Sequence, residues 1–230
     1  MQQGTLEGAG FEGIGHDPGD LERWCRRRGV RWLIGVDEAG RGPLAGPVHA
    51  AAVALDCQTL FSADVPEWFQ SLDDSKKLEA EDRLAACERI QEETPAWSIE
   101  TASHREIDAV NILQATRRAM AEAVEGVVSM IDGPVDWVFV DGNVGIEVSH
   151  PQRALVGGDG RSWAIGAASI LAKVSRDRVM VDAHESWPAY DFSSNKGYPT
   201  AAHREALKSR GPCPIHRRSF NGVPDSGDPD

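Results

Sequence analysis

The sequence predicts an α/β fold built around a mixed β-sheet. Short apolar runs alternate with longer segments of helical periodicity, which is typical of α/β proteins. The first two expected strands, residues 30–37 and 47–55, are joined by a Gly/Pro-rich turn suited to a hairpin. A near-continuous apolar run at 135–140 predicts a buried central strand. Because an initial hairpin is combined with strands that alternate with helices, we expect a sheet of mixed direction.

The remaining elements follow from local patterns. Helices are expected where apolar residues recur every three or four positions, and Ser103 with Glu106 forms a capping box that starts one of them. Thr200 caps a final helix that stops at Gly211. The expected strands are residues 30–37, 47–55, 97–102, 135–140 and 153–156. The expected helices are residues 77–93, 103–128, 162–185 and 200–211, with loops at 66–75 and 188–199.

The length and composition predict a single core domain with appendages. The chain has 230 residues, and 41% of them are apolar, which is enough for a sizeable core. We expect a flexible arm at residues 1–28, the core domain at 29–186, a C-terminal extension at 187–222 and a disordered tail at 223–230.

Charge and cysteine usage narrow the class of protein. The net charge of −12 argues at first against a nucleic-acid partner. Basic residues outnumber acidic ones between residues 157 and 222, however, so one segment could face a polyanion. The four cysteines form no C-x-x-C pair, which disfavours a zinc site. We see no signal peptide and no membrane-spanning run, and we expect a cytoplasmic protein.

Acidic residues stand at the ends of three expected strands. Asp37 and Glu38 follow the first strand, Asp141 ends the strand at 135–140, and Asp159 follows the last strand after two glycines. Adjacent strands would bring these carboxylates close together, and a bound cation would relieve their repulsion. Oxygen-only ligands favour Mg²⁺ or Mn²⁺, and four carboxylates can hold two ions for displacement at phosphorus. The alternative for each acid alone is a structural turn residue.

Six segments together resemble ribonuclease HII, the type 2 ribonuclease H family. They are GVDEAGRGPLAGPV from residue 35, LDDSKKL from 72, VDGN from 140, AASILAKVSRD from 167, NKGYPT from 195 and HRRSF from 216. The resemblance covers residues 34–223, with the segments in family order. It implies a ribonuclease H-like mixed β-sheet flanked by helices, with a C-terminal helical extension. It also implies endonucleolytic cleavage of RNA in RNA–DNA hybrids and beside single ribonucleotides in duplex DNA.

The resemblance also assigns residue roles. It implies that the four carboxylates hold the metals and activate water, giving a 3′-OH and a 5′-phosphate. Gly40, Arg41 and Gly42 match the element whose backbone senses the ribose 2′-OH, and Tyr198 matches the tyrosine that packs on the sugar just 3′ of the ribonucleotide. We expect a monomer whose partners are RNA–DNA hybrid and ribonucleotide-containing duplex DNA, with no membrane. Basic residues that could neutralise backbone phosphates are Lys76, Lys173, Arg176, Lys196 and the Arg217–Arg218 pair.

One position departs from the family, and two alternatives stay open. Gly157 stands where a lysine usually precedes Gly158 and Asp159, and Arg161 is our hypothetical substitute for the missing cation. One alternative is a different phosphoryl-transfer enzyme built on the same metal cluster. The other is a catalytically silent hybrid-binding module. Asp177, beside two arginines, is interpreted as a structural acid that organises them and not as a metal ligand.

Overall fold

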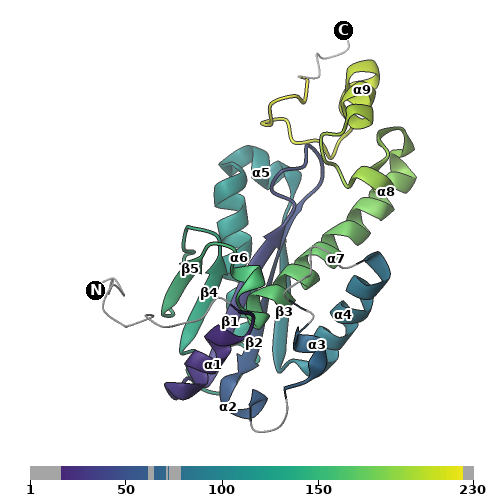
Figure 1. Ribbon diagram of the computed structural model, residues 1–230. Coiled ribbons are helices and arrows are strands. Elements are labelled where there is room, and N and C mark those ends of the chain that lie inside the picture. Colours follow the sequence, from purple (N-terminus) through teal and green to yellow (C-terminus); the bar gives the residue numbers. More distant parts are fainter. Residues whose placement is uncertain (1–16, 62–64, 71, 73–78, 225–230) are drawn as a thin grey trace.

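The fold has three layers, with helices on both faces of a five-stranded sheet (Figure 1). The computed structural model describes residues 17–61, 65–70, 72 and 79–224. The strands of the sheet are β1 (Trp32–Ala39), β2 (Val48–Asp56), β3 (Ala96–Ala102), β4 (Trp137–Asp141) and β5 (Gln152–Leu155). The α-helices described are α1 (Asp20–Arg27), α2 (Cys57–Leu60), α3 (Glu67–Gln70), α4 (Ala80–Glu93), α5 (His104–Val110), α6 (Ile112–Val128), α7 (Trp163–Ser186), α8 (Phe192–Asn195) and α9 (Ala201–Arg210).

The sheet is mixed, as the sequence predicts. The strand order is β3-β2-β1-β4-β5. β1 pairs antiparallel with β2, and β2 pairs antiparallel with β3. β4 runs parallel to both β1 and β5. The parallel half of the sheet therefore brings the carboxyl ends of β1, β4 and β5 to the same edge.

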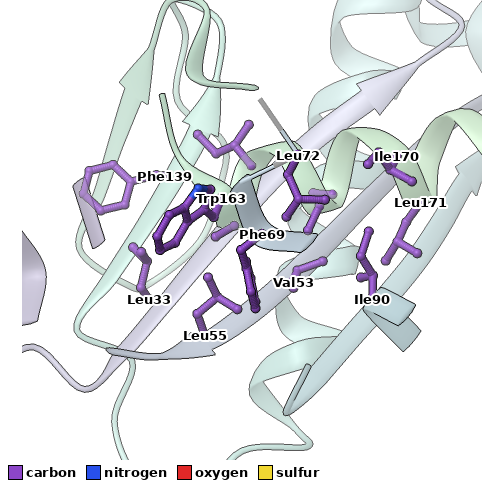
Figure 2. Close-up of a cluster of buried hydrophobic side chains, with 14 of the residues drawn as sticks. Leu33, Val53, Leu55, Phe69, Leu72, Ile90, Phe139, Trp163, Ile170 and Leu171 are labelled. Carbon is purple, nitrogen blue, oxygen red and sulfur yellow. The ribbon is translucent and has the colours of Figure 1, made fainter. Parts of the chain in front are cut away.

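Alternating side chains along β1 supply both hydrophobic cores. Leu33 is buried in the cluster on the α7 side, where Trp163 and Phe69 also pack (Figure 2). Ile34 and Val36 are buried in the opposite cluster, against α6. Successive strand residues point to opposite faces, so a central strand covered by helices on both sides must be apolar throughout. This explains why the first strand reads as an uninterrupted apolar run.

Helix α7 lies against β1 unusually closely at Gly35. A Cβ on Gly35 would overlap the backbone of Ala164 and Ile165, so only glycine permits this approach. Ser162 caps α7 by accepting a hydrogen bond from the backbone N–H of Ile165 at 3.3 Å. The close approach fixes α7 beside the end of β1, two residues before Asp37.

The expected single helix over residues 103–128 is wrong, because the structure contains two helices there. The capping box of Ser103 and Glu106 starts α5, as predicted. Asn111 then adopts a left-handed φ of 72° and ends α5. Its side chain accepts a hydrogen bond from the backbone N–H of Gln114 at 3.0 Å, which caps α6. Asn tolerates left-handed φ and is a favoured N-cap, so one residue both breaks and restarts the helix.

The expected flexible arm is also wrong over its last part, because Asp20–Arg27 form α1. Leu21, Trp24 and Cys25 are buried in the α7-side cluster. Buried Glu22 accepts hydrogen bonds from the Ser162 hydroxyl at 2.7 Å and the Ala164 N–H at 3.2 Å. The burial of this apolar face provides the stabilisation that holds the helix in place. Residues 1–16 of the arm lie outside the described residues.

The C-terminal extension packs as a third cluster at one end of the molecule (Figure 1). The expected loop at 188–199 contains a 3₁₀ turn, η3 (Pro188–Tyr190), and the short helix α8. Thr200 and Gly211 bound α9 as predicted. Val223, at the start of the expected tail, is buried in this cluster, while residues 225–230 lie outside the described residues. Among the described residues, no helix combines the length and apolar character needed to cross a bilayer.

Candidate active site

Strand register brings the first three predicted carboxylates together. Val36 of β1 pairs with Val140 of β4 in parallel register. The next residues along these neighbouring strands are Asp37 and Asp141, so they leave the sheet side by side. Glu38 follows on β1, one residue before the strand ends at Ala39.

Burial and mutual repulsion both disfavour the charged forms of Asp37 and Glu38. Burial raises the pKa of Asp37 well above its ordinary value, and the charges of Glu38 and Asp141 raise it further. A hydrogen bond from Ser169 on α7 opposes that shift. Burial also raises the pKa of Glu38, although its ion pair with Arg41 at 3.2 Å acts in the opposite direction.

Asp159 lies beside the cluster and outside the cavity that the other three acids share. It is buried within the 3₁₀ turn η2 (Gly158–Gly160), which follows β5. The backbone N–H of Gly158 donates a hydrogen bond to Asp141 Oδ1 at 2.7 Å, so this turn is anchored to the β4 carboxylate. Asp159 is not among the residues that line the cavity. The structure thus gathers three of the four predicted acids and places the fourth on a neighbouring turn.

The three acids open into a cavity of about 450 Å³. The other elements that were predicted to read the substrate line the same cavity. Its lining residues include Asp37, Glu38, Asp141, Gly40, Arg41, Gly42, Arg83, Ser169, Lys173 and Tyr198. Tyr198 is 43% exposed, and a Cβ added to Gly42 would lie 3.6 Å from its Cε1 atom. We call residues 40–47, which join β1 to β2, the glycine loop. The glycine loop and the Tyr198 ring therefore lie beside each other at the same opening.

The donor chemistry of the cluster fits a hard divalent cation. In the part of the chain that the structure describes, no three carboxylate, imidazole or thiol groups converge closely enough to hold a metal ion. Each acid instead faces a protein donor: Asp37 accepts from the Glu38 N–H at 2.7 Å, Glu38 pairs with Arg41, and Asp141 binds Gly158. Because the ligands are oxygens only and their charges repel, a cation would relieve the repulsion once these side chains turn toward it.

The predicted phosphate-binding residues divide by exposure. Lys173 lines the cavity and donates to Asp177 at 2.6 Å, so Asp177 pairs with this lysine one turn earlier on α7. Lys196 donates to the carbonyl of Ser193 and lines a neighbouring groove. Lys76 lies outside the described residues. Arg161 closes the η2 turn, and its Nε is buried without a hydrogen-bond partner among the described residues.

Arg176 and Arg217 do not fit the predicted role as phosphate ligands. Their side chains are 1% and 0% exposed, and both guanidinium groups donate to backbone carbonyls. A buried guanidinium engaged in this way cannot reach a phosphate at the surface. The sequence shows that these positions are basic, but it does not show whether each side chain points toward solvent or into the protein.

Sequence reasoning also missed cavity residues that depend on helix packing. Ser169 is four residues before Lys173 on α7, so the two share a helix face, and this spacing could have identified it. Arg83 comes from α4, and it reaches the cavity only because α4 packs against α7. No local pattern around Arg83 distinguishes it from the other helical arginines.

Comparison with known proteins identifies the family of this chain. The family model described as Ribonuclease HII matches residues 34–223. Ribonuclease HII of Geobacter sulfurreducens is 45% identical over 204 residues, covering 89% of this chain and 88% of the relative. Ribonuclease HII of Idiomarina loihiensis is 48% identical over 193 residues, covering 83% and 96%.

Solved structures show the same fold at lower identity. The ribonuclease H2 from Pyrococcus horikoshii OT3 has a TM-score of 0.66 and 23% identity, covering 84% of this chain and 95% of that chain. Bst-RNase HIII in complex with Mn²⁺ has a TM-score of 0.69 and 17% identity, covering 93% of this chain and 74% of that chain. The family model and the curated relatives together show that this chain belongs to the ribonuclease HII family, metal-dependent endoribonucleases that act on RNA–DNA hybrids.

Proposed function

We propose that this protein incises the RNA strand of hybrids and also cuts duplex DNA on the 5′ side of single embedded ribonucleotides, leaving a 3′-OH and a 5′-phosphate. One observation carries the proposal. Three carboxylates suited to a metal line the same cavity as the glycine loop and Tyr198. Selective cleavage beside a ribose requires metal ligands for the phosphate and a surface that recognises the sugar, both in one site.

The acidic residues would hold Mg²⁺ or Mn²⁺. Asp37, Glu38 and Asp141 are the proposed ligands, and Asp159 joins them from the η2 turn that Gly158 ties to Asp141. Bound divalent ions supply a water of lowered pKa and stabilise the leaving oxygen. Burial of Asp37 keeps its carboxylate poorly solvated, so it gains more from a cation than an exposed acid would.

The glycine loop and Tyr198 would read the sugar. The 2′-OH both donates and accepts hydrogen bonds, and it is the group that distinguishes RNA from DNA. Backbone flanked by Gly40 and Gly42 can approach it without a side chain in the way. The half-exposed ring of Tyr198 offers a flat surface to the next sugar, where a deoxyribose packs better than a bulkier ribose. Lys173 and Arg83, which line the same cavity, would contact the phosphates beside that sugar.

The direct test is cleavage of a duplex that contains one ribonucleotide, with Mn²⁺ or Mg²⁺ present. We expect incision 5′ of the ribonucleotide, ends that a polymerase can extend, and no cleavage of the all-DNA duplex. Asp141→Asn should abolish incision, whereas Asp182→Asn, which removes the same charge from an exposed site on α7, should retain it. Equal cleavage of the all-DNA duplex would indicate a different phosphoryl-transfer enzyme. Binding of hybrid without cleavage under any metal would indicate a silent binding module.

We also propose that the protein acts as a monomer, since one chain contributes the proposed metal ligands and both sugar-reading elements. Light scattering during size-exclusion chromatography, at the concentration of the activity assay, checks this. A dimer that dissociates with loss of activity would contradict it.

A further inference from the structure

Three loops meet behind the cavity and are joined by backbone hydrogen bonds. The N–H of Leu44 donates to the carbonyl of Gly197 at 2.8 Å, and the N–H of Gly46 donates to Ile215 at 2.9 Å. The N–H of Arg217 donates back to Leu44 at 2.8 Å. The loop that follows β1, the segment before Tyr198 and the HRRSF segment therefore form one connected unit.

Arg217 holds the glycine loop from behind. Its guanidinium donates to the carbonyl of Gly40 at 2.6 Å and to that of Arg41 at 3.0 Å. It also donates to Gly46 at 2.9 Å and to Pro47 at 3.2 Å. Every one of these acceptors belongs to the loop after β1. Because the guanidinium is planar with a fixed fork of donors, these bonds define the path of the loop and not only its position.

Arg176 connects the same loop to the tyrosine segment. From α7, it donates to the carbonyls of Pro47 at 3.0 Å, Ala45 at 3.2 Å and Lys196 at 3.0 Å. Lys196 lies two residues before Tyr198, and the Arg176 guanidinium lies 5.9 Å from the centre of the Tyr198 ring. Both arginines thus donate to the carbonyl of Pro47, and each donates to a different set of other carbonyls. Arg217 anchors the loop, and Arg176 spans from the loop to the tyrosine.

Core filling alone does not account for this pair. Two like charges are buried close together, and burial with the charge of Arg176 lowers the pKa of Arg217 to about 9. A buried cation is costly unless it is fully hydrogen-bonded, and apolar side chains of similar volume often stabilise a core as well or better. Apolar side chains, however, cannot donate hydrogen bonds to the carbonyl groups of the glycine loop. Only a donor such as a guanidinium can fix the path of that flexible backbone.

We propose that Arg217 and Arg176 are positioning residues that determine selectivity: Arg217 sets the backbone that reads the 2′-OH, and Arg176 sets the distance from that backbone to Tyr198. This inference rests on the proposed function. It assigns different tasks to the two arginines, so it predicts different substrate profiles. Each cut requires a 2′-OH to be read. Only a cut at an isolated ribonucleotide presents a deoxyribose to Tyr198, because in a continuous RNA strand the next sugar is a ribose.

The test compares Arg217→Lys and Arg176→Lys on two substrates, a duplex with one ribonucleotide and a continuous RNA–DNA hybrid. Arg210→Lys is the matched control, since Arg210 is exposed at the end of α9 in the same C-terminal extension. We expect Arg217→Lys to lower kcat/KM at least tenfold on both substrates. We expect Arg176→Lys to lower the ratio of single-ribonucleotide to hybrid cleavage at least fivefold, and Arg210→Lys to leave that ratio unchanged. Rates are measured well below each melting temperature, so that loss of folded protein does not contribute.

A purely structural role would lower stability and leave kcat/KM and the substrate ratio of the folded protein at wild-type values, and that result would overturn the inference. If a lysine variant does not fold, Asp108→Ala replaces it. Asp108 on α5 accepts hydrogen bonds from the N–H groups of Arg218 and Ser219, both at 2.9 Å, so its loss loosens the turn but keeps both guanidinium groups. We expect this variant to lose twofold to fivefold on both substrates, and wild-type rates would count against the inference. Failure of the wild-type protein to cut the single-ribonucleotide duplex would instead refute the proposed function.

Discussion

The two glycines that flank Arg41 should respond to alanine in opposite ways. Gly40 has a left-handed φ of 99°, and a Cβ there would overlap the Arg176 side chain. Left-handed backbone costs an L-residue about 1–2 kcal/mol, before the displacement of Arg176 is counted. Gly42 has no such φ, and its added methyl would make an ordinary contact at 3.6 Å with Tyr198. Gly42→Ala should therefore change the free energy of unfolding by no more than about 0.5 kcal/mol.

Although Gly42→Ala should leave stability nearly unchanged, it should lower activity. The Gly42→Ala methyl points into the space where a ribose would approach, so it should disrupt the hydrogen bond to the 2′-OH. Loss of such a bond costs about 1–3 kcal/mol, and each 1.36 kcal/mol is about tenfold in rate. We therefore expect kcat/KM on the single-ribonucleotide duplex to fall roughly 5- to 150-fold, with a melting temperature near wild type. Gly40→Ala should lower the melting temperature by about 4 °C or more, because about 2 kcal/mol corresponds to that shift in a chain of this size.

The assays are initial rates on the single-ribonucleotide duplex and thermal unfolding followed by circular dichroism. Gly133→Ala is the matched control: Gly133 has φ 93° with nothing within 4 Å of an added Cβ, so it isolates the backbone cost and should not affect activity. Wild-type kcat/KM in Gly42→Ala would refute the idea that the loop reads the sugar at this point. An unchanged melting temperature in Gly40→Ala would refute the packing of Arg176 against the loop.

Three further predictions test other parts of the structure. Asn111→Ala should lower the free energy of unfolding in urea by about 2 kcal/mol, because it removes the cap of α6 and places an alanine at a left-handed φ. Asn111→Gly should lower it less, and equal urea midpoints for the two variants would contradict this. Burial lowers the pKa of His216 to about 4, and its Nε2 lies 3.0 Å from that of His203. The unfolded chain therefore takes up a proton below about pH 6.5 that the native state refuses, so stability should fall as the pH drops from about 6.5 to 4. His216→Gln should flatten this dependence of melting temperature on pH, and an unchanged slope would argue against it. Finally, Mn²⁺ should raise the melting temperature of the wild-type protein more than that of Asp141→Asn in scanning calorimetry, because a ligand stabilises the state that binds it; equal shifts would exclude Asp141 as a ligand.

The sequence allowed the mixed sheet and the acid cluster to be predicted because both depend on local patterns. An apolar run that ends in an acid predicts a buried strand with a carboxylate at its edge, and Asp37 and Asp141 obey this rule. The capping box at Ser103 and the stop at Gly211 are equally local. The helix break at Asn111 was also within reach, because Asn is one of the few residues that favours left-handed φ. The apolar spacing of Leu21, Trp24 and Cys25 likewise could have indicated α1.

The sequence by itself determined where the acids, the glycine loop and the tyrosine would stand, since strand ends and turns are set by neighbouring residues. Only the tertiary structure decided which basic residues face the cavity and which support it from behind. Arg176, Arg217 and Lys173 look alike in sequence, yet two are buried and one lines the opening. The position of Asp159 likewise depends on a tertiary contact, because the Gly158 N–H ties its turn to Asp141 on another strand. The reason is physical: the direction of a long charged side chain depends on which carbonyls and charges other segments bring near it, and these contacts join residues far apart in the chain.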